Sequence, residues 1–284
     1  MVIRVRSKLK NVYVKVVAVI IARNERENII KVIELLKQQT LNLGRIIVVN
    51  DGSTDETGEI ARKMGCEVID LPYHEESFLG RPELAERLNI GLKLAEKYNP
   101  DYVLVMGADH ILPKDYVKRI VERMEVNPKL VVASGHVRGE PYSESNPRGS
   151  GRIIRASWLK REFGSLCFPV CWGWEAYILL KALKSGYEVK CFREIESEVE
   201  RRTGLGKAGC WGKAMYALGY DWKYALGRCL LTFIKSPKAG LNMFWGWVKH
   251  EDVERTDIAE WVNQMQKREF WRKVCEIVKC GGRK

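Results

Sequence analysis

Residues 14–21 read Val-Lys-Val-Val-Ala-Val-Ile-Ile, and this run decides the fold. β-Branched residues dominate it without a polar alternation, which is typical of a strand buried on both faces of a parallel sheet. Residues 27–39 follow with apolar side chains at helical spacing, and residues 45–49 return to a β-branched run. The sequence therefore opens with a predicted strand, a crossover helix and a second parallel strand.

The same alternation continues along the chain. The next predicted elements are helices over residues 55–64, 82–98 and 113–125 and strands over residues 67–70, 102–106 and 130–134. Ser53 or Thr54 is expected to cap the helix over residues 55–64. This order predicts a doubly wound α/β fold with right-handed crossovers, in which ligands bind at the carboxyl ends of the strands. Chemistry is therefore expected in the loops after Ile21, Val49 and Met106.

The second half is more mixed. Gly, Pro and Ser residues fill positions 139–151, where we expect a flexible flap, and a helix over 172–186 and a strand over 188–192 follow. Beyond residue 200 the pattern becomes helical and rich in tryptophan. We therefore predict a catalytic domain over residues 1–200 and a basic helical extension over residues 201–284, whose end (252–279) would dock on the domain or form a homo-oligomer.

Composition limits the class of protein. In these 284 residues, 46% are apolar and 30% charged, which excludes a disordered chain. The eight cysteines are scattered and follow no signal peptide, which favours reduced thiols in the cytoplasm over a disulfide framework. The apolar run over residues 12–22 is interrupted by Lys15 and is too short to cross a bilayer.

Polar clusters follow three of the predicted strands. They read Ala-Arg-Asn-Glu (residues 22–25), Asn-Asp-Gly-Ser-Thr-Asp (50–55) and Gly-Ala-Asp-His (107–110). Each cluster alone is more typical of a turn or a helix cap than of a site. Their joint occurrence at three strand ends favours a binding site, which a fourth segment, Arg-Leu-Asn-Ile-Gly (87–91), would face from a helix opposite the third cluster.

In this order the four motifs resemble the family-2 nucleotide-sugar glycosyltransferases of the GT-A fold, over roughly residues 14–195. The resemblance implies a Rossmann-like α/β/α sandwich with a mostly parallel sheet and a UDP- or GDP-linked sugar donor. The residues it implies for donor binding are Ala22, Arg23, Glu25, Asn50, Asp51, Arg87, Ala108 and Asp109. Glu25 and Asp51 would hold the nucleoside, and Asp109 would ligate Mg²⁺ or Mn²⁺ at the diphosphate.

The third motif departs from the family pattern, because Gly107 replaces the first acid of the usual Asp-x-Asp. Two interpretations remain open. Asp109 could hold a metal with help from His110 or His136, or Arg and Lys side chains could neutralise the leaving diphosphate without a metal. We favour a retained divalent cation.

The helix expected over residues 172–186 supplies a candidate base. Glu175 stands eleven residues before Gly186, where the family has its catalytic base, although Trp174 replaces the acid before it. A glutamate that opens a helix more often compensates the helix dipole. An inverting transfer, however, needs a carboxylate that accepts the proton of the acceptor hydroxyl.

The start of the predicted extension resembles a phosphate-binding element of the polyprenyl-phosphate glycosyltransferases. Its candidate phosphate or acceptor ligands are Arg201, Arg202 and Lys207, with Gly206 in place of a serine. Forked guanidinium groups and an ammonium suit phosphate oxygens. The same pattern also fits a solvated basic linker, and neither interpretation is favoured.

Charge is concentrated in the extension. Nine Lys or Arg residues and one acid, Asp221, lie in residues 201–250 of a chain whose net charge is +12. Aromatic residues interleave with these cations, which favours a peripheral position on the inner face of an anionic membrane. The aromatic residues could instead pack on the catalytic domain, and nucleic acid binding is disfavoured because no recognisable module accompanies the charge.

The sequence therefore predicts a cytoplasmic, inverting glycosyltransferase with a lipid-linked phosphate or glycan as favoured acceptor. A soluble or protein-bound glycan is an alternative acceptor. Because Gly107 and Trp174 stand where acids are expected, a catalytically degenerate nucleotide-sugar-binding protein is the alternative from another class.

Overall fold

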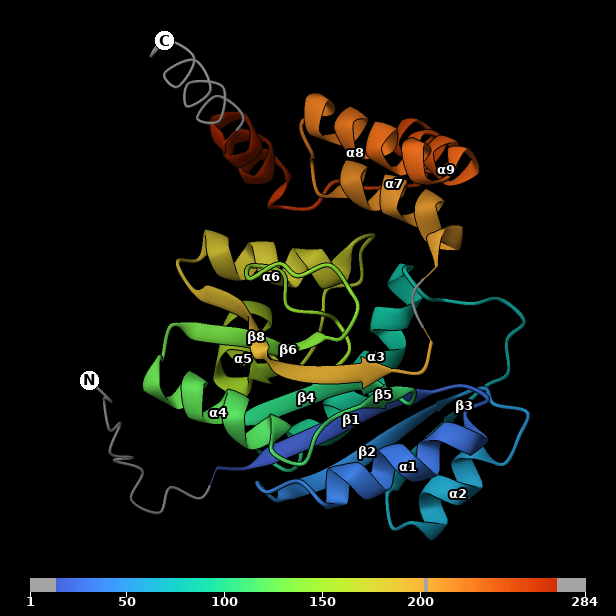
Figure 1. The fold of residues 1–284 in the computed structure, drawn as a ribbon, viewed down its shortest axis with the longest axis vertical. Helices are drawn as coiled ribbons and strands as arrows, with labels where there is room; N and C mark the ends of the chain where they lie inside the picture. Colours follow the sequence, from blue (N-terminus) through green and yellow to red (C-terminus); the bar gives the residue numbers. More distant parts are fainter. Residues whose placement is uncertain (1–13, 202–203, 270–284) are drawn as a thin grey trace.

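The computed structural model describes residues 14–201 and 204–269. An eight-stranded sheet with helices on both faces forms the larger body, and a smaller group of helices lies beyond α6 (Trp174–Lys184) (Figure 1). The strands are β1 (Val16–Ala22), β2 (Leu43–Asp51), β3 (Glu67–Leu71), β4 (Tyr102–Gly107), β5 (His110–Ile111), β6 (Leu130–Val137), β7 (Arg152–Arg155) and β8 (Glu188–Val199). The other helices of this body are α1 (Arg26–Lys37), α2 (Thr57–Lys63), α3 (Pro82–Glu96), α4 (Tyr116–Val126) and α5 (Ala156–Phe163).

The sheet has the order β3-β2-β1-β4-β7-β6-β8-β5, and its first four strands are mutually parallel. This confirms the predicted mostly parallel α/β sheet. β7 runs antiparallel between β4 and β6, and β5 pairs antiparallel with β8. Neither strand was predicted, because segments of four and two residues are too short to show a strand periodicity.

Alternate residues of β1 pack against opposite helical layers. Val16, Ala18 and Ile20 belong to the core under α1, α2 and α4, whereas Val17 and Val19 belong to the core under α3, α5 and α6. A strand covered on both faces has no solvated side, so its sequence shows no polar alternation. This explains why residues 14–21 are continuously apolar apart from Lys15.

The turn after β2 differs from its predicted form. Neither Ser53 nor Thr54 caps α2; instead Asp55 accepts a hydrogen bond from the Thr57 amide at 3.0 Å. Gly52 has a φ of +67°, and a Cβ there would lie 2.8 Å from the Pro72 carbonyl oxygen. Both the backbone conformation and this close approach require glycine.

The extension begins with the short η1 (Leu205–Lys207) and continues as α7 (Ala208–Ala217), α8 (Trp222–Lys235) and α9 (Pro237–Val248). These three helices share a small apolar core, which includes Met215, Cys229 and Met243. The division of the chain at residue 200 stays a prediction.

Residues 259–269 are helical, and the rest of the predicted C-terminal helix lies outside the described residues. Ile258 and Val262 pack with Tyr177 of α6, and the Tyr177 hydroxyl donates to Asp257 at 2.6 Å. The extension is therefore joined to the larger body through α6. In the part of the chain that is described, every helix is too short or too polar to cross a bilayer.

Two isoleucines of α1 test the contribution of the core. Ile33 is fully buried, whereas Ile30 on the same helix is 42% exposed. Replacing Ile33 with alanine should lower the free energy of unfolding by about 2–5 kcal/mol, because it removes buried methyl groups and leaves a cavity. Replacing Ile30 with alanine should change it by only about 0.5 kcal/mol. Urea unfolding of both variants measures the difference, and equal losses would contradict the packing described.

Candidate active site

The three predicted polar clusters lie at the carboxyl ends of adjacent parallel strands. In the register of the sheet, Ala22 of β1 pairs with Asn50 of β2, and Ile21 pairs with Gly107 of β4. The loops that follow β1, β2 and β4 therefore leave the sheet side by side, on the edge where α/β folds bind ligands.

Hydrogen bonds join the first two loops. The Asn24 amide donates to the Ser53 hydroxyl at 3.0 Å, and the Asn24 side chain accepts from the Thr54 amide at 2.8 Å. The Glu25 amide donates to the Thr57 hydroxyl at 2.8 Å. Ser53 and Thr54 of the second motif, together with Thr57, therefore hold the first loop in place.

Arg201 joins the first cluster to the third. Its guanidinium forms an ion pair with the buried Glu25 and lies 3.7 Å from an Asp109 carboxylate oxygen. Strand β8 brings Arg201 here, because the Glu200 amide donates to the Asp109 carbonyl at 3.0 Å. Arg202, the other predicted phosphate ligand in this segment, lies outside the described residues.

Asp51 and Asn50 present buried acceptors. Asp51 Oδ1 lies 3.2 Å from His74 Nε2 and 3.6 Å from Arg87 Nε, yet within the described chain neither it nor Asn50 Oδ1 receives a hydrogen bond. The Asn50 amide nitrogen donates to Asp70 at 2.8 Å. A buried acceptor without a donor costs about 1–3 kcal/mol. A ligand that supplies N–H or O–H donors would recover this free energy.

The loop over residues 72–81, which the sequence analysis did not select, closes over this position. The Arg23 guanidinium donates to the carbonyl oxygens of His74 and Glu76, so Arg23 holds the loop rather than standing free for a ligand. His74 stacks on Phe78 with ring centroids 4.1 Å apart, and Arg87 lies over the Phe78 ring. The sequence indicated this loop only through His74 and Phe78, which stand among residues typical of turns.

The segment over residues 87–91 has three separate roles. Arg87 approaches Asp51 of the second cluster, so the prediction that this segment faces the third cluster is wrong for Arg87. Asn89 exchanges two hydrogen bonds with the backbone of Phe168, at 2.9 and 2.7 Å. A Cβ at Gly91 would lie 2.6 Å from Val19, so the glycine lets α3 pack closely on the sheet.

His110 contacts two serine side chains. Its ring is buried, and its two nitrogens lie 2.8 Å from the Ser150 hydroxyl and 2.9 Å from the Ser197 hydroxyl. Burial, aided by the charge of Arg148, lowers the pKa of His110 to about 3. Both ring nitrogens of His110 are thus occupied by serine hydroxyls, and its role as a metal ligand stays a prediction. His136, the other imidazole considered, lies edge-on to the ring of Tyr142.

The end of the predicted flap belongs to the site. The Gly107 amide donates to the Ser150 hydroxyl at 3.0 Å, and a Cβ at Gly149 would meet a Glu175 carboxylate oxygen. The buried Arg152 donates to the Glu175 carbonyl at 3.1 Å. Residues 149–152 therefore connect the third cluster to the first turn of α6.

Lys207 lies close to both Asp109 and Glu175, and Arg148 lies close to Asp109. Burial raises the pKa of Asp109, although Arg148 and Lys207 oppose this rise. Burial lowers the pKa of Lys207, and the neighbouring carboxylates of Glu175 and Asp109 act in the opposite direction. Glu175 itself is exposed to solvent. The carboxylates of Asp109 and Glu175 therefore share Lys207 as a neighbouring cation.

Comparison with known proteins identifies the class. The model of the family "Glycosyl transferase family 2" matches residues 17–171, more than half of the chain, so the protein belongs to this family. The succinoglycan biosynthesis protein ExoA of Rhizobium meliloti is 27% identical over 192 residues, covering 66% of this chain and 56% of that protein. The 4,4'-diaponeurosporenoate glycosyltransferase of Staphylococcus haemolyticus is 40% identical over 131 residues, covering 44% of this chain and 33% of that protein.

Solved structures show the same fold. The Pyrobaculum calidifontis mannosyltransferase PcManGT, in complex with GDP-Man and Mn²⁺, superposes with a TM-score of 0.55 at 15% identity, over 82% of this chain and 72% of that chain. S. aureus TarS in complex with UDP-GlcNAc gives a TM-score of 0.52 at 19% identity, over 67% and 59%. The predicted GT-A fold is confirmed by these likenesses.

The buried ring of His110 predicts an acid-dependent stability. In the unfolded chain the His110 ring has a pKa near 6.5, whereas in the folded chain its pKa is about 3. Between these two pH values the unfolded chain therefore binds one more proton than the folded chain. The free energy of unfolding should therefore fall with decreasing pH across this window. Its slope should be up to about 1.4 kcal/mol per pH unit steeper than in His110→Gln. Urea unfolding between pH 7 and pH 4 measures both slopes, and parallel curves would contradict the assignment.

Proposed function

We propose that the protein is an inverting glycosyltransferase that moves a sugar from a nucleotide-diphosphate donor to an acceptor bound beside Glu175. One observation carries the proposal: Arg201 holds Glu25 and Asp109 together, although 84 residues separate the two acids in the sequence. Membership of glycosyl transferase family 2 supports the same activity.

The nucleoside is proposed to bind between the first two loops and the loop over residues 72–81. Asp51 and Asn50 would accept from the donors of a base or ribose, because their buried oxygens receive no hydrogen bond from the described residues. Phe78 and Arg87 give this position an apolar and a cationic wall. Both UDP- and GDP-linked sugars are candidates, since TarS was solved with UDP-GlcNAc and PcManGT with GDP-Man.

Asp109 is proposed to bind a divalent cation together with the diphosphate. Within the described ranges no cluster of three or more His, Cys, Asp or Glu side chains could hold an ion by itself. Mg²⁺, however, is often held by one carboxylate and substrate phosphates, and Asp109 fits that arrangement. When bound, the cation would neutralise charge on the leaving diphosphate. Arg201 and Lys207 are the candidates for the same task without a metal.

Glu175 is proposed as the base. Its carboxylate would accept the proton of the acceptor hydroxyl while that oxygen attacks the anomeric carbon from the face opposite the diphosphate. The bond between the anomeric carbon and the diphosphate oxygen breaks in the same step, which inverts the configuration. Lys207 would stabilise the Glu175 carboxylate before the reaction, since the two charges attract each other.

The favoured acceptor is a lipid-linked phosphate or glycan. Lys207 and Arg201 lie near Asp109 and could bind a phosphate of such an acceptor, as Arg202 could from the same segment. If the attacking group is itself a phosphate, no base is needed and Glu175 would orient the acceptor. A soluble or protein-bound glycan, and a protein that binds nucleotide sugars without turnover, are the competing proposals.

The base assignment is tested with Glu175→Gln, which keeps the shape but cannot accept a proton. The substrate for this test is the nucleotide sugar that most raises the melting temperature of the wild-type protein. Its turnover should fall about 10²–10⁴-fold in the variant, because general base catalysis is lost. The stabilisation by the donor should remain, because Glu175 lies on the acceptor side. Glu34→Gln, on the exposed face of α1, is the matched control and should retain full turnover. Full turnover in Glu175→Gln would remove Glu175 from this role.

The metal assignment is tested with Asp109→Asn. In wild-type protein with UDP or GDP present, Mn²⁺ should raise the melting temperature further, because the ion joins the nucleotide to Asp109. Asp109→Asn should lose this increment. The raised pKa of Asp109 means that protons compete with the ion, so the increment should shrink as the pH falls. Undiminished turnover in EDTA would instead favour charge neutralisation by Arg201 and Lys207.

A further inference from the structure

The helices α8 and α9 carry apolar side chains on their outer faces. On α8, Leu231 is 65% and Ile234 78% exposed, and Leu230 lies beside them in the helix. On α9, Leu241, Trp245 and Val248 are exposed at intervals of four and three residues, which places them on one face. We call these six residues the outer face. They are Leu230, Leu231, Ile234, Leu241, Trp245 and Val248.

The outer face is additional to the side of each helix that packs. The opposite side of α8 is buried through Ala225 and Cys229, and Met243 of α9 joins them in the small core. α8 is therefore apolar on two sides, although the described structure covers only one. A helix that is apolar all round is typical of burial in a larger assembly or contact with a membrane.

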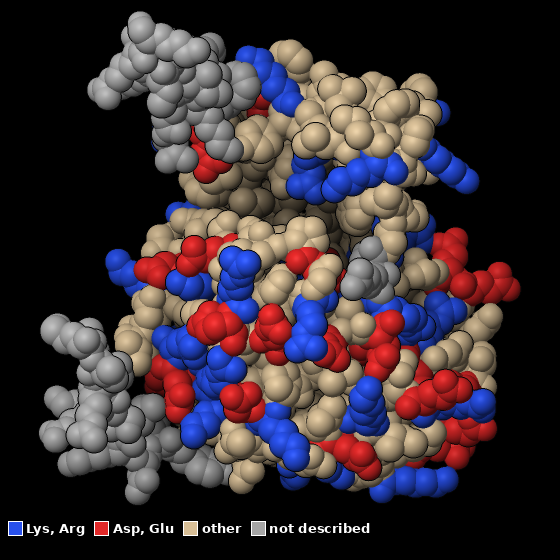
Figure 2. Space-filling model, viewed as in Figure 1, with Lys and Arg blue, Asp and Glu red and all other residues tan. Residues whose placement is uncertain are grey.

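The charges beside the outer face in the sequence have one sign, because every charged residue between positions 222 and 249 is a Lys or Arg. The acid that precedes α8, Asp221, is buried, and its carboxylate accepts from the Lys223 amide at the start of that helix. Lys235, Lys238 and Lys249 are exposed close to the apolar residues in the sequence. Figure 2 shows the uncharged surface over α8 and α9 with Lys and Arg at its margins.

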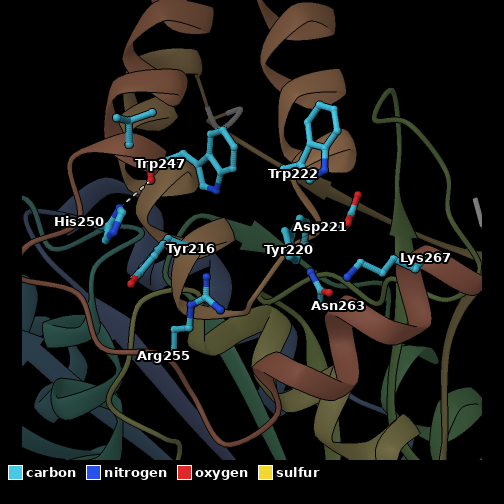
Figure 3. A pocket seen from close by; sticks show the side chains of 10 residues that line it. Tyr216, Tyr220, Asp221, Trp222, Trp247, His250, Arg255, Asn263 and Lys267 are labelled. Atoms are coloured by element: carbon cyan, nitrogen blue, oxygen red, sulfur yellow. Dashed lines mark hydrogen bonds between the residues drawn. The ribbon is translucent and has the colours of Figure 1, made fainter.

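A cavity of about 410 Å³ lies between α7, the ends of α8 and α9, and the segment after α9 (Figure 3). Trp222, Trp247 and Val248 line it, and Val248 is also part of the outer face. Arg255 and Lys267 line the same cavity from the segment after α9. Asp221 lines it too, so the cavity carries charges of both signs beside its tryptophans.

We propose that the outer face docks on a membrane that contains anionic lipid. Apolar side chains would enter the interface, tryptophan would lie at the headgroup level, and the lysines would meet lipid phosphates. A second copy of the chain fits poorly, because two faces with the same positive margin repel each other. Nucleic acid fits poorly as well, since a phosphate backbone would leave the leucines and the isoleucine in water.

Docking would hold the first turn of α6, which carries Glu175, near the lipid. A Cβ at Gly173, two residues before Glu175, would lie 2.9 Å from Ala214 of α7. Lys213 of α7 lies over the ring of Trp172, 4.8 Å from its centroid. The extension and the first turn of α6 are therefore in direct contact. The docking surface does not depend on the proposed glycosyl transfer, and its test needs no donor.

The test is flotation of the full chain with vesicles of phosphatidylcholine alone or with phosphatidylglycerol added. Wild-type protein should float with the mixed vesicles and much less with the neutral ones, because each cation near an anionic surface contributes about a fivefold factor. Leu231→Glu/Ile234→Glu should lower the partition coefficient by about tenfold or more, since two buried apolar contacts become charged. Both positions are exposed, so the variant should fold.

Val126→Glu is the matched control. Val126 on α4 is 81% exposed in the larger body, and its replacement should leave flotation unchanged. Wild-type protein that stays unbound with the mixed vesicles would overturn the proposal, as would a double variant that floats like wild type. Sedimentation of wild type as a dimer, with a monomeric double variant and no vesicle binding, would instead assign the outer face to a second copy.

Discussion

The structure depends on the pairing of carboxylates that the fold withdraws from water. Glu25, Asp51 and Asp109 follow adjacent strand ends, where the edge of a parallel sheet is partly desolvated. Removing a carboxylate from water is costly unless a cation or a donor accompanies it. The cations come from later in the chain, with Arg201 between Glu25 and Asp109 and Lys207 beside Asp109. Asp51 instead has His74 and Arg87 beside it, so only Glu25 and Asp109 depend on cations from the second half of the chain.

The family match ends at residue 171, four residues before Glu175. Everything that we place on the donor side up to Asp109 lies inside the match, whereas the base and the whole extension lie outside it. This division agrees with a donor-binding unit that family members share and an acceptor side that differs among them. It also explains why the fold and the family are established and the acceptor is still a proposal.

The sequence predicted the fold well because long β-branched runs leave few alternatives. It missed β7, whose sequence Arg-Ile-Ile-Arg is too short to carry a period. Within the site, strand ends located the acids, but side-chain direction depended on distant partners. His110 contacts Ser150 and Ser197, which are 40 and 87 residues away, and Arg23 contacts a loop 51 residues away. No local pattern in the sequence indicates such contacts, so the partners of His110 and of Arg87 could not be predicted from it.

Arg201 links the acids at the strand ends to the helical extension. Its guanidinium lies between Glu25 and Asp109, and α7 begins only seven residues later at Ala208. A ligand that takes the place of this guanidinium on Asp109 would displace a side chain of the segment that leads into the extension. If the extension changes position with that side chain, thermodynamic reciprocity requires the position of the extension to change the affinity for that ligand by the same factor. Nucleotide binding and membrane binding would then each change the affinity of the other through the side chain of Arg201.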